Sequence, residues 1–101
     1  MRDVYTMPRA GQVWKHLKTG NLYLIDHVGL DAETGGPDVS YYRLDEFETY
    51  RLHGPSAVKW CHRALEDFLR SVRNASNEFE FRFVWVADGT EGLSAAQQPG
   101  V

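Results

Sequence analysis

Basic and imidazole side chains gather in one short stretch near the start of this sequence. Lys15, His16 and Lys18 lie within four residues of one another. A histidine among cations can contact an anionic group or move a proton. No carboxylate or thiol stands next to His16 in the sequence to complete a catalytic pair. The stretch therefore indicates either a ligand contact or a structural histidine that bonds a neighbouring strand or turn.

The single cysteine stands beside a histidine, at Cys61 and His62. Adjacent residues point to opposite faces of a strand and diverge by about 100° on a helix, so this pair is poorly placed for thiolate–imidazole chemistry. The histidines also lack the spacing of metal ligands; they are His16, His27, His53 and His62. We therefore expect no catalytic residue, no metal site and no cofactor, and a lone cysteine excludes an internal disulfide.

A second group of cations surrounds Trp60. It consists of Lys59, His62, Arg63, Arg70 and Arg73. Nucleic-acid-binding proteins use such cations for phosphates and an exposed aromatic ring for base stacking. Glu66 and Asp67 offset part of this charge, and 11 basic against 14 acidic residues give the chain a net charge of −3. A nucleic-acid partner is therefore possible but disfavoured by the overall charge.

An acidic cluster lies in the middle of the chain, at Asp45, Glu46 and Glu48, and the aromatic residues Phe47 and Tyr50 accompany it. The alternating pattern of Phe47–Leu52 predicts a strand at the edge of a sheet. Such an edge can add a strand from a partner protein or from a second copy of the chain. Charges on an edge strand also prevent unwanted pairing. This segment favours a protein partner and leaves a homo-oligomer possible.

The elements that position these residues are mostly strands. Gln12–Leu17 and Asn21–Val28 have strand-like composition and are separated by a polar turn that contains Gly20, which predicts a β-hairpin. The second of these strands carries apolar residues on both faces, as in a small barrel with covered strands. A glycine- and proline-containing loop at Asp31–Asp38 precedes another strand, Val39–Leu44.

The second half of the chain predicts two further strands and one helix. Ala57–Trp60 is expected to be a short strand. Arg63–Arg73 has helical periodicity, carried by Leu65, Phe68, Leu69 and Val72. Phe79–Val86 is the clearest strand, and its aromatic residues alternate; they are Phe79, Phe81, Phe83 and Trp85. We expect this aromatic stripe to be core and not a ligand platform.

Part of the sequence is similar to a known family. In GQVWKHLKTGNLY the matching residues are Gly11, Trp14, Lys15, His16, Leu17, Lys18, Gly20 and Tyr23. Further matches are Tyr42, Arg43, Trp60, Arg63, Leu65, Phe68, Arg82 and Phe83. The chain thereby resembles a small bacterial and phage family, domain-of-unknown-function family number sixteen fifty-three. Leu30 and Asp31 depart from its Arg and His, and Asp45–Pro55 resembles an insertion.

The resemblance implies a small SH3-like β-barrel and no assigned activity. Together with the predicted elements, it leads to a mainly β (α+β) fold, an SH3-like barrel of five to six strands with one helix. We expect a lead-in over 1–7, a single domain over 8–87 and a flexible tail over 88–101. No apolar run reaches the ~18 residues that a membrane span needs, and no signal peptide is visible, so we expect a cytoplasmic protein with no membrane partner.

Three functions remain open. The preferred one is a non-catalytic small binding module for protein–protein interaction, such as a phage or bacterial regulatory or accessory protein. The alternative is a nucleic-acid-binding domain with a basic and aromatic patch. The second alternative is a small-ligand-binding or enzymatic domain, which would need a pocket joining His16, Tyr23, Tyr42 and Arg43. The candidate partner-binding residues are Lys15, His16, Lys18, Tyr23, Tyr42, Arg43, Glu46, Phe47, Glu48, Trp60 and Arg63.

Overall fold

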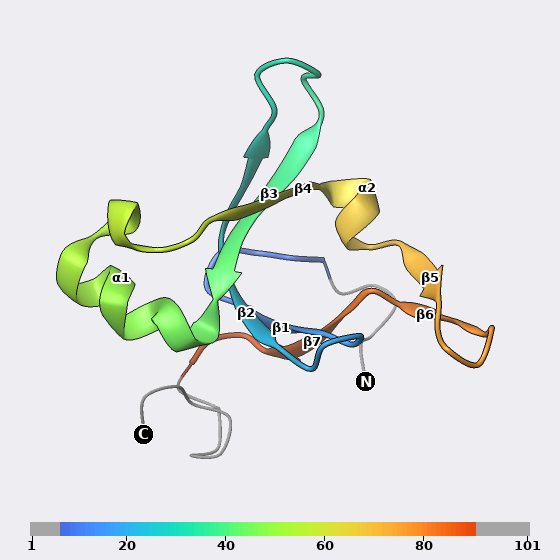
Figure 1. The fold of residues 1–101 in the computed structure, drawn as a ribbon. Coiled ribbons are helices and arrows are strands. Elements are labelled where there is room, and N and C mark those ends of the chain that lie inside the picture. Colours follow the sequence, from blue (N-terminus) through green and yellow to red (C-terminus); the bar gives the residue numbers. More distant parts are fainter. Residues whose placement is uncertain (1–6, 91–101) are drawn as a thin grey trace.

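The computed structural model describes residues 7–90 of the 101-residue chain (Figure 1). Residues 1–6 of the predicted lead-in and 91–101 of the predicted tail lie outside the described residues. The main sheet is antiparallel, with strand order β4-β3-β2-β1-β7. Its strands are β1 (Val13–His16), β2 (Leu22–Leu30), β3 (Pro37–Arg43), β4 (Cys61–Ala64) and β7 (Phe83–Ala87).

The remaining elements are short. A two-stranded antiparallel sheet pairs β5 (Ser71–Arg73) with β6 (Phe79–Phe81). The helices are η1 (Leu44–Glu46), α1 (Phe47–His53), η2 (Pro55–Ala57) and α2 (Leu65–Phe68). Within residues 7–90, no helix has the length and apolar character of a membrane span.

The mainly β fold is confirmed, but the strands do not close into a barrel. β4 and β7 are the two edges of the five-stranded sheet, and each is hydrogen-bonded to one neighbour. The chain between them forms α2 and the β5–β6 hairpin instead of a strand that would join the two edges. Five to six strands in one barrel are therefore corrected to an open five-stranded sheet with a separate two-stranded sheet.

The predicted first hairpin is confirmed as β1–β2. Val13 pairs with Leu24 and Lys15 with Leu22. Gly20 has a φ of +77°, a conformation that glycine adopts without the steric cost of a Cβ atom. Its N–H donates to the carbonyl oxygen of His16 at 2.8 Å. The turn therefore fixes the end of β1, where His16 lies.

Helices and loops cover both faces of the main sheet, which explains the apolar residues on both faces of β2. On one face Val13, Leu24 and Tyr42 pack with Leu44 and Val58, against the helical segment that contains α1. On the other face one residue of α2 packs with buried residues of the sheet. This group consists of Trp14, Ile25, Val39, Tyr41, Phe68 and Phe83. In Figure 1 α1 and α2 lie on opposite sides of the central strands.

The segment Phe47–Leu52, predicted as an edge strand, forms most of helix α1. Phe47 and Tyr50 are three residues apart, so they share one side of the helix and both pack against the core. Arg51 pairs with Glu48 at 2.7 Å on the exposed side. The three-residue spacing therefore prevails over the alternating pattern, and this segment offers no edge for strand addition. Ala57–Trp60, predicted as a strand, begins in η2 and continues without regular structure.

The predicted helix Arg63–Arg73 is reduced to the single turn of α2. Its ends pair with other strands: Arg63 lies opposite Val39, and Val72 lies opposite Glu80. An isolated helix of about this length is marginal, so pairing with distant strands decides the outcome. The helical pattern still identifies Phe68, which is fully buried.

The predicted strand Phe79–Val86 divides at Arg82 into β6 and β7. The Arg82 N–H donates to the carbonyl oxygen of Arg70, and the Arg82 carbonyl oxygen accepts the N–H of Leu17. The segment before Arg82 therefore belongs to the two-stranded sheet, and the chain joins the main sheet only after this residue. As a result Phe83 is 2% exposed but Phe79 is 67% exposed, so the prediction that the whole aromatic stripe is core is wrong.

Candidate anion-binding pocket

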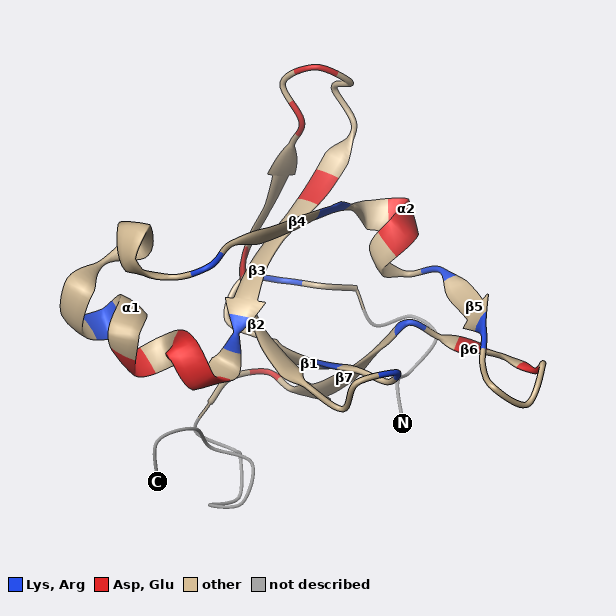
Figure 2. Cartoon of the chain, in the orientation of Figure 1, with Lys and Arg blue, Asp and Glu red and all other residues tan. Residues whose placement is uncertain are grey.

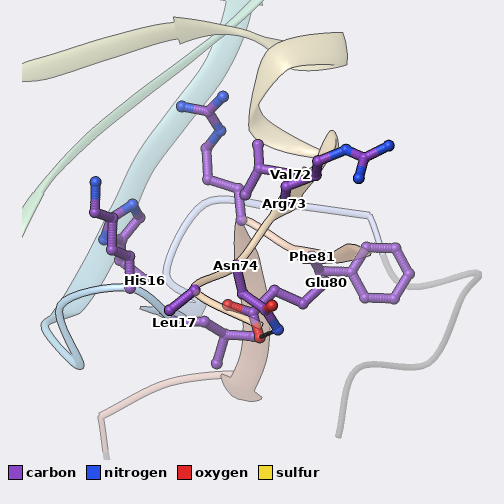
Figure 3. Close-up of a pocket in the computed structure, with 10 residues that line it drawn as sticks. His16, Leu17, Val72, Arg73, Asn74, Glu80 and Phe81 are labelled. Carbon is purple, nitrogen blue, oxygen red and sulfur yellow. Dashed lines mark hydrogen bonds between the residues drawn. The ribbon is translucent and has the colours of Figure 1, made fainter. Parts of the chain in front are cut away.

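A hollow with a volume of about 690 Å³ lies between the end of β1 and the β5–β6 hairpin (Figure 3). Residues 16–18 line one side, and residues 72–75 and 80–82 line the other. The hairpin is held by Asn74, whose side-chain oxygen accepts the N–H groups of Ser76 and Glu78. Asn77 occupies the left-handed region with φ 62°, which asparagine tolerates well.

The basic residues His16, Lys18 and Arg82 line this hollow, and Arg63 lies close enough to add its charge at His16. We call these four residues the cationic cluster. Burial, followed by the positive charges of Arg63, Arg82 and Lys18, lowers the pKa of His16 below its usual 6.5. Nδ1 of His16 and Oγ1 of Thr19 are hydrogen-bonded at 2.9 Å. These effects favour the neutral imidazole in the free protein, and a negative charge beside it would favour the protonated form.

The Phe83 ring packs against two members of the cationic cluster. The His16 ring lies 5.0 Å from the Phe83 centroid, and the guanidinium carbon of Arg63 lies 5.8 Å from it. Nε of Arg63 also donates to the hydroxyl oxygen of Tyr41 at 3.1 Å. These contacts hold two members of the cluster in place before any ligand binds.

The cationic cluster has few negative neighbours. The ion pairs of residues 7–90 lie elsewhere: His27–Asp26, Arg43–Asp45, Arg51–Glu48 and Arg70–Asp67. Glu80 is the one carboxylate among the lining residues, and it accepts a 3.4 Å hydrogen bond from the Asn74 amide. Nε of Arg82 is buried without a hydrogen-bond partner. A buried donor without a partner is costly, and this cost falls on a residue that lines the hollow.

Of the sequence-predicted residues, His16 and Lys18 line this pocket, and Arg63 and Tyr23 lie beside it. His16, Lys18 and Arg63 belong to the cationic cluster. Tyr23 lies beside them, because its ring is 6.0 Å from that of Phe83. The sequence placed these residues in separate segments, and the pairing of β1 with β2 and β7 brings them together.

Four other predicted residues lie elsewhere. Tyr42 and Trp60 pack together on the opposite face of the sheet, with ring centroids 5.4 Å apart. Lys15 is exposed and neighbours His16 along β1, so its side chain points to the other face. Arg43 pairs with Asp45 at 2.6 Å. A single pocket of His16, Tyr23, Tyr42 and Arg43 is therefore not formed.

The acidic candidates are occupied by contacts within the chain. Glu48 binds Arg51, a side-chain oxygen of Glu46 accepts the N–H of Lys59, and Phe47 packs against the core. Figure 2 shows acidic residues along η1 and the start of α1, away from the β5–β6 hairpin. The acidic segment and the cationic cluster are thus separate surfaces.

Sequence reasoning missed Arg82 and the β5–β6 hairpin. In a continuous strand, Arg82 would only be a solvent-facing residue between Phe81 and Phe83, so nothing marked it as part of a site. The asparagine-containing turn between Arg73 and Phe79 was the available signal, because asparagine at such positions marks a hairpin.

Other reactive groups on the described chain show weaker arrangements. Oγ of Ser40 and Nδ1 of His62 are 2.9 Å apart, but Ser40 is buried and no carboxylate of residues 7–90 bonds His62. Burial raises the pKa of the Cys61 thiol, which disfavours the reactive thiolate. Across residues 7–90, no group of three or more His, Cys, Asp or Glu side chains could hold a metal ion.

No protein-family model, curated protein or solved structure matches this chain.

Proposed function

We propose that this chain is a non-catalytic binding module and that it binds nucleic acid through the cationic cluster. The observation that carries the proposal is that His16, Lys18 and Arg82 line one hollow, that Arg63 adds its charge at His16, and that none of the four has an ion-pair partner within residues 7–90. Phosphate contacts by Lys and Arg supply most of the sequence-independent affinity for nucleic acid. A local basic site can act in this way although the chain as a whole carries a net charge of −3.

We prefer nucleic acid to a protein partner because the structure removes the main argument for binding a protein by strand addition. That argument relied on Phe47–Leu52 as an edge strand, and this segment is helical. The hollow, at about 690 Å³, lies within the range of small-molecule sites and can hold a nucleotide unit. Arg82 lines the hollow, and phosphate oxygens accept charge-assisted hydrogen bonds from guanidinium groups.

Protein–protein interaction is the second candidate function. It is favoured by Leu52, which is 65% exposed on α1 and lies one helical turn from Glu48. An apolar side chain beside acidic ones suits a partner with a basic, apolar surface. If this surface binds a partner, Leu52→Glu will weaken that complex and leave nucleic-acid binding unchanged.

Two predictions from the sequence stay predictions: the cytoplasmic location and the resemblance to the domain-of-unknown-function family. Neither of them supplies an activity, so the proposed function depends on the cationic cluster alone.

The test is binding of fluorescently labelled oligonucleotides, followed by anisotropy. Affinity should fall steeply between about 50 and 200 mM salt. Lys18→Ala and Arg82→Ala should each weaken binding to all sequences and reduce the slope of log affinity against log salt by about 1. Arg51→Ala is the matched control, because Arg51 is already paired with Glu48 on α1. Absence of salt-dependent binding, or equal losses in the control, would overturn the proposal.

A further inference from the structure

Phe79 is an apolar ring in an exposed position that the fold does not explain. It is 67% exposed at the start of β6. Among residues 7–90 it is the aromatic member of the exposed large hydrophobic residues, the others being Met7, Val28, Leu30 and Leu52. An exposed aromatic ring beside cations is the side-chain combination on which single-stranded bases stack.

Resting on the proposed function, we infer that the ligand is single-stranded nucleic acid and that Phe79 stacks against one of its bases. The binding surface would then have two parts: the cationic cluster for phosphates, and the Phe79 ring for a base. The β5–β6 hairpin connects the two parts.

Arg73 lies over the Phe79 ring, and Asn77 holds the Arg73 side chain in that position. Arg73 lies opposite Phe79 in the β5–β6 register, and its guanidinium carbon is 4.8 Å from the Phe79 centroid. The same guanidinium donates to the side-chain oxygen of Asn77 at 2.6 Å. Among the described residues Arg73 has no carboxylate ion-pair partner, and it also lines the hollow. It can therefore bind a phosphate or extend the flat stacking surface.

The geometry of the hairpin favours a flexible strand over a compact ligand. In Figure 3 the Phe81 ring extends away from His16, on the far side of the hairpin. Phe79 shares a face of β6 with Phe81, because side chains two residues apart point the same way. A ligand that reaches both His16 and Phe79 must therefore pass over the hairpin. A chain of several nucleotides can do so.

A nucleic-acid duplex does not offer a free base face to the Phe79 ring. Its bases are stacked on one another inside the helix, so none is available to the Phe79 ring without unpairing, which costs a few kcal/mol. A single strand has free base faces at every nucleotide. Stacking of this kind tolerates any sequence, so we expect weak sequence preference.

The experiment compares a single strand of about 12 nucleotides with a duplex of the same sequence, at one salt concentration. The single strand should bind more tightly. Phe79→Ala should weaken its binding by about 5- to 150-fold and leave duplex binding unchanged. Phe79→Trp should restore tight binding, because it keeps an aromatic face. Leu52→Ala is the control, since Leu52 is a comparably exposed apolar residue on α1, and it should change nothing.

The outcomes separate this inference from the proposed function. If single strand and duplex bind equally and Phe79→Ala has no effect, the inference is wrong while the proposed function stands. If neither form binds the parent protein, the proposed function itself fails. Because Phe79 is exposed, the variants should keep the parent circular dichroism spectrum, and this is checked first.

Discussion

The rings of Phe68 and Phe83 lie parallel in the core, with centroids 4.2 Å apart and planes 4° apart. Phe68 ends the single turn of α2, and Phe83 begins β7. The Phe83 ring also packs against His16 and Arg63. One aromatic contact thus joins the core to the cationic cluster. Substitutions in the core should therefore also disturb the positions of His16 and Arg63.

Phe68→Ala should be among the most damaging single substitutions in the chain. The side chain is fully buried, and its removal leaves a cavity against Trp14, Tyr41 and Phe83. Such truncations cost about 3–5 kcal/mol, much of the stability of a small domain. The free energy of unfolding from urea denaturation measures the loss. Leu52→Ala, at an exposed position, should stay within about 0.5 kcal/mol of the parent; similar losses in both variants would contradict this packing.

Local sequence patterns predicted the elements whose partners lie close in the chain. The β1–β2 hairpin and β3 could be predicted, because strand alternation and a glycine turn are local signals. The helical pattern after Arg63 and the alternation after Phe47 were local signals too, but each was overridden by distant contacts. β4 and β5 pair with β3 and β6, and α1 presents Tyr50 to the core.

Only part of the candidate site could be predicted, because its other residues are brought in by contacts between distant parts of the sequence. His16 and Lys18 stand together in the sequence, so their shared role could be suggested. Arg63 and Arg82 join them through sheet pairing and through the break between β6 and β7. Exposure of Phe79 also follows from that break, since a continuous strand would have placed it in line with the buried Phe83.

Gly20→Ala should destabilise the turn that ends β1. Gly20 has a φ of +77°, and the left-handed region costs other residues about 1–2 kcal/mol. A Cβ atom at this position would meet nothing within 4 Å, so the loss would come from backbone strain alone. Gly29→Ala is the control, because Gly29 lacks a positive φ and its Cβ would make an ordinary 3.5 Å contact. Urea unfolding of both variants decides the point, and an equal effect would exclude the strain argument.

Tyr42 should make the protein sensitive to alkaline pH. Burial, followed by the nearby Tyr50, Asp26 and Glu46, raises the pKa of Tyr42 to about 12. The unfolded pKa is 10.0, so the folded state favours the neutral phenol. The stability from this shift is complete below pH 10 and is lost as the pH rises toward 12. Absorbance titration of phenolate formation should show a late component that is reduced in Tyr42→Phe, with burial also raising the pKa of the remaining Tyr41; an unchanged titration in that variant would refute the assignment.

His16 should give the protein the opposite sensitivity, on the acid side of neutrality. Its folded pKa is lowered below 6.5 by burial and by the charges of Arg63, Arg82 and Lys18. Above pH 6.5 the imidazole is neutral in both folded and unfolded chains, and stability is complete. As the pH falls below 6.5, the unfolded chain binds the proton more readily, so stability decreases until the folded pKa is passed.

A bound anion should reverse the shift at His16. A phosphate beside the imidazole favours its charged form, so the His16 pKa should rise on binding and the complex should take up a proton. Affinity for a single-stranded oligonucleotide should therefore increase as the pH falls below 6.5. The measurement is an NMR titration of the His16 ring protons with and without oligonucleotide, alongside binding across the same pH range. His16→Gln should flatten the pH dependence of binding, while His53→Gln, on α1, should preserve it. A His16 pKa that does not move when oligonucleotide binds would place the phosphate away from the cationic cluster.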